Sequence, residues 1–209
     1  MGEQPRLREP GDALATDRAT PNNNLIYVQE VPVGQATPTP VTTKCATGEI
    51  GDGLPVSNDY NATLRDELCH LGSAYIDGTL KGRLTVSAEN NIVVTGNLAY
   101  SGGAGGIDTL GLIANNSVKV SHPVRCTNLN TTTNVCSAGT DLDRPNGTKF
   151  RDPQIHASTL TLQHSFTVQS WRMGSQLGVL TAFGAISQRY RGPVGVGESS
   201  DTGYLKLFL

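Results

Sequence analysis

The stretch that decides the fold runs from Gly82 to Leu98 and reads GRLTVSAENNIVVTGNL. Apolar and polar residues alternate in its first half and again from Ile92 onward, and Asn90 and Asn91 separate the two halves. Alternation with a period of two is typical of a β-strand that buries one face. We therefore expect two short strands with a polar corner between them.

The same pattern returns 26 positions later, in LGLIANNSVKV, and a partial third copy follows at Leu160, Leu162, His164, Phe166 and Val168. Repetition of a strand pattern at fixed spacing indicates a solenoid, whose successive turns stack on one another. We predict an all-β fold: a single-stranded right-handed parallel β-solenoid (β-helix) with decorating loops, its handedness taken from the general rule for parallel crossovers. The residues that match at the offset of 26 are Leu84 and Leu110, Val86 and Leu112, Ala88 and Ala114, Asn90 and Asn116, Ile92 and Val118, and Val94 and Val120.

Glycine and asparagine mark the corners of the predicted turns. Gly78, Gly96 and Gly184 occupy the same place in a short apolar motif, where a positive φ or a close approach of neighbouring turns would require glycine. Gly78 and Gly96 are 18 positions apart, which predicts a length of 18 residues for an undecorated turn. We expect Asn90 and Asn116 to form a ladder of side-chain amides, with His164 at the end of that ladder.

The remaining segments interrupt this pattern. We expect residues 1–23 to form a polar tail that is either disordered or caps one end, and residues 24–209 to form the solenoid domain. Loops are expected at about 29–73, 101–108 and 122–153, because these segments lack the alternation of the strands. Insertions of different length on a constant scaffold are usual in solenoids. Any specific activity is therefore expected in the loops.

The composition excludes some classes of protein. Charged residues make up 16% of the 209 residues and the net charge is −2, which gives no long-range attraction to nucleic acid or to anionic membranes. No run of about 18 apolar residues is present, and the N-terminal residues lack the apolar core of a signal peptide. We expect the chain to be a fragment whose export segment is missing, and the protein to be extracellular or on a cell surface.

Four cysteines are present, at Cys45, Cys69, Cys126 and Cys136. An even number favours disulfides and an oxidising compartment, and of the three possible connectivities we favour Cys126 with Cys136 and Cys45 with Cys69. Four free thiols in a cytosolic protein are the alternative. No CxxC occurs, so we expect no metal site.

The chain lacks the sequence patterns of common enzymes. GxSxG, HExxH and the P-loop are absent, and no catalytic or cofactor-binding residue is predicted. The segment 141–147 (DLDRPNG) resembles half of a calcium loop, but Pro145 breaks the pattern. His122 and His156 are expected on the surface. A lyase would need clustered acids with an arginine base, for which Asp152 beside Arg151 is the one candidate.

Four segments carry a resemblance to a known group of proteins. The runs YIDGTLKGRLTVSAENNIVVTGNL (75–98), DTLGLIANNSVKVSHPV (108–124), LTLQHSFTVQSW (160–171) and LTAFGAISQRYRGPVG (180–195) resemble largely uncharacterised bacterial surface proteins. In those proteins a β-solenoid domain follows a pilin-like anchoring helix, and they are related to the large β-solenoid minor pilins of type IV pilus and competence systems. The resemblance covers about residues 24–204, and it brings no catalytic residues.

These observations lead to three functional expectations. The first is a non-catalytic extracellular structural or adhesion module, associated with a pilus, that presents loops from a rigid solenoid to pilus proteins, cell-envelope proteins or surface polysaccharide. The second is a carbohydrate-binding or polysaccharide-degrading β-helix protein. The third is DNA capture at a pilus tip, which would require five arginines to form one stripe, namely Arg125, Arg144, Arg151, Arg189 and Arg191.

Overall fold

The computed structural model describes residues 24–29, 72–130, 135–143, 148–195 and 202–209, and within them the chain is all-β and contains no helix. The described part of the chain contains fourteen strands. Their bounds are β1 Leu25–Val28, β2 Ala74–Leu80, β3 Arg83–Ala88, β4 Ile92–Tyr100, β5 Thr109–Ala114, β6 Val118–Val120, β7 Val124–Asn130, β8 Val135–Asp141, β9 Gln154–His156, β10 Ser158–Thr161, β11 Phe166–Val168, β12 Gln176–Phe183, β13 Ile186–Gln188 and β14 Gly203–Phe208.

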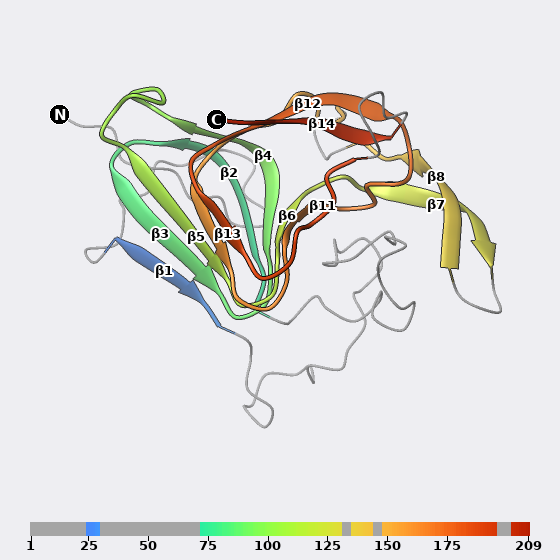
Figure 1. Ribbon diagram of the computed structural model, residues 1–209, viewed down its shortest axis with the longest axis horizontal. Coiled ribbons are helices and arrows are strands. Elements are labelled where there is room, and N and C mark those ends of the chain that lie inside the picture. Colours follow the sequence, from blue (N-terminus) through green and yellow to red (C-terminus); the bar gives the residue numbers. More distant parts are fainter. Residues whose placement is uncertain (1–23, 30–71, 131–134, 144–147, 196–201) are drawn as a thin grey trace.

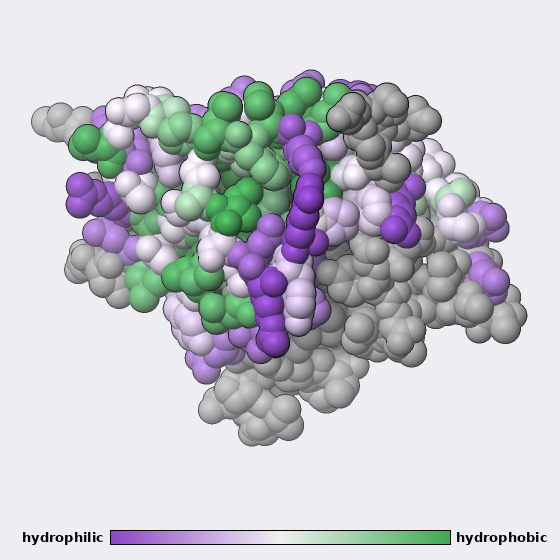
Figure 2. Space-filling view, viewed as in Figure 1, coloured by the Kyte–Doolittle hydropathy of each residue, from purple (hydrophilic) through white to green (hydrophobic). Residues whose placement is uncertain are grey.

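Most strands belong to two parallel sheets between which the chain alternates. The first sheet has the order β1-β3-β5-β10-β13, and the second has the order β11-β6-β4-β9-β12-β14, with β2 also paired to β4. The long strand β4 connects two groups of strands in the second sheet. At its start Ile92 pairs with Val118 of β6, and near its end Leu98 pairs with Ile155 of β9. Figure 1 shows the first sheet facing β2, β4, β6 and β11, while β12 and β14 lie across the top. Figure 2, in the same view, shows hydrophobic residues in green along that top edge.

The predicted register between neighbouring repeats is confirmed. Strand β3 pairs with β5 and strand β4 pairs with β6 at the expected offset, so that Leu84 lies beside Leu110 and Ile92 beside Val118. Strand β11 continues the second column, because Phe166 pairs with Val118. The alternating apolar residues of these strands are buried and form the centre of the core. Each such side chain contributes roughly 1.5–3 kcal/mol on burial.

The third copy differs from the prediction in strand β10. The sequence predicted Leu160 and Leu162 as inward residues, which is wrong: their exposed fractions are 37% and 52%, whereas Thr159 and Thr161 are buried. Thr159 pairs with Leu112 and Thr161 with Ala114. The corner from Thr161 to Phe166 contains one residue more than the corner from Ala114 to Val118. A shift of one residue reverses the faces of a strand, so the extra corner residue turns both leucines outward.

The predicted turn of 18 residues holds for only half of its length. Ala74 and Ile76 pair with residues 18 positions later, but after a register shift Gly78 pairs with Leu98 and not with Gly96. Gly96 lies against Asp77, where a β-carbon would be 2.8 Å from the Asp77 Cβ. Gly78 has a φ of +118°, a conformation that favours glycine. The two glycines are therefore needed for different reasons and do not stack.

The third glycine of the motif combines both requirements. Gly184 follows β12 with a φ of +129°, and a β-carbon there would lie 2.3 Å from the carbonyl oxygen of Ala157. No other residue could occupy this corner without moving the neighbouring strand.

Two of the predicted insertions lie largely within the described residues. Residues 101–108 form a tight turn, in which the Asp108 carboxylate accepts hydrogen bonds from the backbone of Gly82 (2.7 Å) and Gly102 (2.8 Å). The insertion predicted at 122–153 as an irregular loop contains an antiparallel hairpin, β7–β8, which projects from the parallel sheets (Figure 1). The tail 1–23 and nearly all of the loop 29–73 lie outside the described residues.

Candidate functional site

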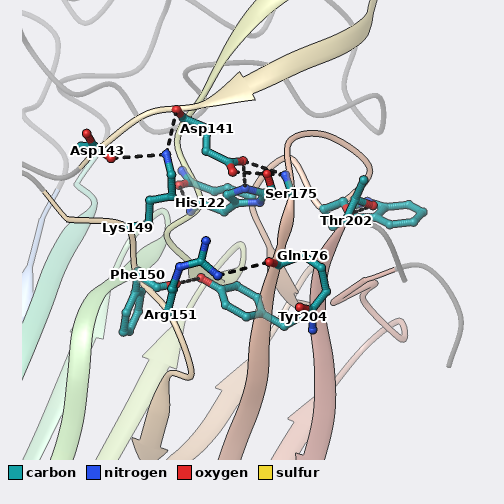
Figure 3. Close-up of polar contacts among 12 residues, drawn as sticks. His122, Asp141, Asp143, Lys149, Phe150, Arg151, Ser175, Gln176, Thr202 and Tyr204 are labelled. Atoms are coloured by element: carbon teal, nitrogen blue, oxygen red, sulfur yellow. Dashed lines mark hydrogen bonds and ion pairs between the residues drawn. The ribbon is translucent and has the colours of Figure 1, made fainter. Parts of the chain in front are cut away.

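A buried histidine and aspartate lie at the base of the β7–β8 hairpin. His122 follows β6, and its Nε2 is 3.0 Å from Oδ1 of Asp141, the last residue of β8. The expectation of a surface histidine is wrong, because His122 is 1% exposed. The pair therefore joins the two ends of the β7–β8 hairpin directly to each other (Figure 3).

The Asp141 carboxylate also binds the segment that leads into β12. The backbone N–H of Ser175 donates to Oδ1 at 3.0 Å and to Oδ2 at 3.2 Å. The preceding residue, Gly174, has a φ of +72°, and a β-carbon there would lie 1.7 Å from Asp141 Oδ1. Glycine is therefore required at position 174 for the loop to reach the carboxylate.

Further contacts surround this pair. The Lys149 ammonium donates to the backbone oxygen of Asp141 and to Oδ1 of Asp143, both at 3.3 Å. The ring of Tyr204, from β14, meets the His122 ring edge-on at 6.2 Å, and its hydroxyl donates to the backbone oxygen of Phe150. The site thus links the hairpin, the segment after it and the last two strands of the second sheet (Figure 3).

The charge states of the pair follow from burial and hydrogen bonding. Burial lowers the pKa of His122, and this outweighs the opposing effect of the Asp141 carboxylate. For Asp141, burial alone would raise the pKa, but the hydrogen bonds from His122 and Ser175 hold the pKa below its ordinary value. Both pKa shifts agree with a neutral His122 imidazole that donates its Nε2 proton to an ionised Asp141 carboxylate.

This arrangement favours a structural role for the pair. Among the described residues, Nδ1 of His122 has no hydrogen-bond partner, so its lone pair is chemically free. A general base must reach a substrate proton directly or through one water, and a side chain that is 1% exposed does not offer such contact. The order of the contacts also differs from a serine triad, since Asp141 and not the histidine is the central group.

The structure brings two of the predicted corner residues into direct contact. Nδ2 of Asn116 donates to Oδ1 of Asn90 at 3.2 Å. His164 occupies the next corner and donates its backbone N–H to the Asn116 carbonyl at 3.1 Å. Tyr190 continues this row, with its ring 6.5 Å from the His164 ring. The sequence analysis had not included Tyr190, although it follows the strand that pairs with β10.

His156 and Trp171 both pack against neighbouring side chains. His156 was expected on the surface, but its ring lies between those of Tyr100 (5.3 Å) and Phe183 (5.6 Å). Trp171 is buried, and the Arg172 guanidinium lies 4.2 Å from the centre of its ring. Neither residue therefore offers an open ligand platform.

The arginines of the predicted stripe and the candidate acid Asp152 make separate local contacts. Arg151 donates to the carbonyl of Gln176 in β12, whereas Arg189 lies beside the ring of Tyr190 after β13. Asp152, the acid beside Arg151, accepts from the backbone of Val179 at 2.8 Å. Arg144 and the side chain of Arg125 lie outside the described residues.

The cysteine predictions stay untested. Cys45 and Cys69 lie outside the described residues, and of Cys126 and Cys136 only the backbone is described. Cys126 lies on β7 opposite Gly139, and Cys136 lies on β8 opposite Leu129, so the register does not make them direct neighbours across the hairpin. A disulfide between them remains a prediction.

Comparison of the chain with protein-family models, with curated proteins and with solved structures gives no match. Within the described ranges, no three His, Cys, Asp or Glu side chains gather as they would around a metal ion. The same part of the chain has no helix with the length and apolar character needed to cross a membrane. The site is therefore interpreted from its geometry.

Proposed function

We propose that the chain is a right-handed β-solenoid that acts as a non-catalytic structural or adhesion module on a bacterial cell surface, associated with a pilus. The observation that carries the proposal is the continuous parallel pairing of the strands across insertions of different length. Leu112 of β5 pairs with Val86, 26 positions before it, and with Thr159, 47 positions after it. A scaffold of this kind holds inserted segments in fixed positions, as adhesive and structural modules require.

The tight base of the hairpin supports the same role. His122 and Asp141 hold the two ends of the hairpin together, and Asp141 is also bound by Lys149 and by the backbone N–H of Ser175, the residue just before β12. A projecting element that is fixed at its base loses less conformational freedom on contact with a partner than a free loop would. The hairpin and the turn at 101–108 are the surfaces offered to pilus proteins, cell-envelope proteins or surface polysaccharide.

The test separates adhesion from catalysis. The purified chain is incubated with insoluble and soluble bacterial polysaccharides, and both retention of the protein and release of new chain ends are measured. We expect retention on cell envelopes or polysaccharide, reduced when residues 125–140 are replaced by a short turn, without release of sugar. Turnover of a polysaccharide would overturn the proposal in favour of a β-helix enzyme, and absence of retention on every envelope fraction would overturn it as well.

A further inference from the structure

One corner of the parallel sheets carries a continuous row of polar and aromatic side chains. The row consists of Asn90, Asn116, His164 and Tyr190, from four successive repeats. The backbone N–H of each residue donates to the carbonyl of the one before it, at 2.9, 3.1 and 3.3 Å. Strands that pair in this way repeat about every 4.8 Å, so the side chains are spaced evenly along one line.

The exposure of this row increases toward Tyr190. Asn90 is buried and Asn116 is half-buried, whereas His164 is exposed and Tyr190 is 56% exposed. The residues one position earlier in each corner form a neighbouring column, in which Glu89 is half-buried and Asn115, Gln163 and Arg189 are exposed. The two columns together place amides, an imidazole, a phenol and a guanidinium on one surface.

The backbone holds Tyr190 in place. Its carbonyl accepts from Oγ of Ser165 at 2.7 Å, and its N–H donates to the carbonyl of His164. The side chain of Gln188 accepts from the backbone of both Phe166 (2.9 Å) and Gly192 (3.3 Å), which ties the corner to β11. Because the backbone around Tyr190 is fixed, little conformational freedom is lost when a ligand stacks on its exposed ring.

The corner also carries positive charge on two exposed arginines. The Arg189 guanidinium lies 5.4 Å from the centre of the Tyr190 ring, and Arg191 is exposed two residues later. Among the described residues neither arginine has an ion-pair partner, in contrast to Lys149, which pairs with Asp143. In a chain with a net charge of −2, this is a local positive site.

We propose that the Tyr190 corner, defined as Gln163, His164, Arg189, Tyr190 and Arg191, binds an acidic oligosaccharide. The apolar face of a sugar ring stacks on Tyr190, a uronate carboxylate accepts two hydrogen bonds from a guanidinium, and the Gln163 amide binds a hydroxyl group. This activity goes beyond the proposed presentation of loops, since it uses the scaffold itself.

Nucleic acid is the less favourable anion for this corner. Non-specific binding of DNA depends on the number of phosphates neutralised, and two arginines supply only two such contacts. A single uronate carboxylate is matched by one guanidinium, so a short acidic glycan can be bound with the groups present.

The test uses trigalacturonate as the probe, with the neutral galactose trisaccharide of the same linkage as its control. Binding to the full chain is measured by calorimetry and by saturation-transfer NMR. We expect trigalacturonate to bind at least about tenfold more tightly than the neutral sugar. The substitutions Tyr190→Ala and Arg189→Ala should each weaken binding about tenfold, whereas Tyr190→Phe, which keeps the ring, should retain it. Arg83→Ala removes an exposed arginine from β3 and is the matched control, with unchanged binding expected.

Three results would overturn this inference. The first is that the folded chain does not bind trigalacturonate, and the second is that Arg83→Ala loses as much binding as Arg189→Ala. The third is that a single-stranded oligonucleotide binds more tightly than trigalacturonate and that Tyr190→Ala abolishes this binding, which would make the corner a nucleic-acid site. None of these results depends on the hairpin or on the turn at 101–108. Failure here is therefore distinct from failure of the proposed adhesive role.

Discussion

The side-chain amide of Asn116 donates a hydrogen bond to Oδ1 of Asn90 at 3.2 Å, although the two residues are 26 positions apart in the chain. The adjacent backbone groups are joined as well, because the Asn116 N–H donates to the Asn90 carbonyl at 2.9 Å. The corner is thus bonded twice, once through the backbone and once through the side chains.

This contact predicts a measurable cost for Asn116→Ala. Loss of one side-chain hydrogen bond should lower the free energy of unfolding by about 1 kcal/mol, measured by urea denaturation. The control is Asn115→Ala, which changes an exposed amide at the adjacent position and should cost less than about 0.5 kcal/mol. Equal costs for the two variants would show that the ladder adds no stability.

The buried histidine predicts that stability depends on pH. Burial lowers the pKa of His122 in the folded chain, while in the unfolded chain the pKa returns to about 6.5. As the pH falls below that value, the unfolded chain takes up a proton that the folded chain does not. The contribution of His122 is therefore complete above the unfolded pKa and is lost as the pH falls toward the folded pKa.

Denaturation midpoints measured between about pH 5 and pH 7.5 test this prediction, and they should decrease toward the acidic end. His122→Gln removes the titrating group and should flatten the dependence over this range, whatever its own stability. His164→Gln changes an exposed histidine and should leave the dependence as it is. A wild-type profile that is flat, or one that His164→Gln changes instead, would contradict the assignment to His122.

The two inward threonines of β10 predict opposite effects of the same substitution. The buried hydroxyl of Thr159 has no hydrogen-bond partner among the described residues, whereas the hydroxyl of Thr161 donates to the His164 carbonyl at 3.0 Å. Thr159→Val keeps the shape of the side chain and should stabilise the fold by about 1 kcal/mol, because it removes a buried group without a partner. Thr161→Val should be destabilising by a similar amount. Thermal melting of the two variants measures both, and a destabilised Thr159→Val would mean that a partner exists.

Gly174 at the hairpin base can be compared with Gly103, which lies in the turn at 101–108 and has the same φ. Gly174 and Gly103 both have a φ of +72°, but a β-carbon at Gly103 meets nothing within 4 Å. Gly103→Ala should therefore cost only the backbone strain, about 1 kcal/mol. Gly174→Ala must also displace the Asp141 carboxylate and should cost about 2 kcal/mol more. Chemical denaturation of both variants gives the difference, and similar values would mean that the contact with Asp141 is dispensable.

The strand register could be predicted from the sequence because the inward columns repeat without interruption from Leu84 to Val94 and from Leu110 to Val120. The prediction of inward residues failed where either of two alternating sets of side chains could face the core. In β10, Leu160 and Leu162 match the apolar pattern better than Thr159 and Thr161, and only the length of the following corner decides between them.

The candidate site was harder to foresee. Asp141 and His122 are 19 positions apart, on opposite sides of an insertion, and no sequence spacing indicates that the ends of an insertion will meet. Gly174 was the only local signal, since a glycine before β12 permits the contact with Asp141, but a single glycine has many possible reasons. The hairpin itself was missed because its strands, VRCTNLN and VCSAGTD, lack the apolar alternation by which the other strands were recognised.

The closed base of the β7–β8 hairpin separates the length of the insertion from the geometry of the sheets. The entropic cost of lengthening a connection grows only slowly with the number of residues, and the strands on either side keep their partners whatever lies beyond His122 and Asp141. Mutation can therefore replace the outer part of the hairpin wholesale, and selection on that part need not compromise folding. The His122–Asp141 pair is thus the boundary between the outer hairpin, whose length can change, and the sheets, whose strand pairing does not depend on that length.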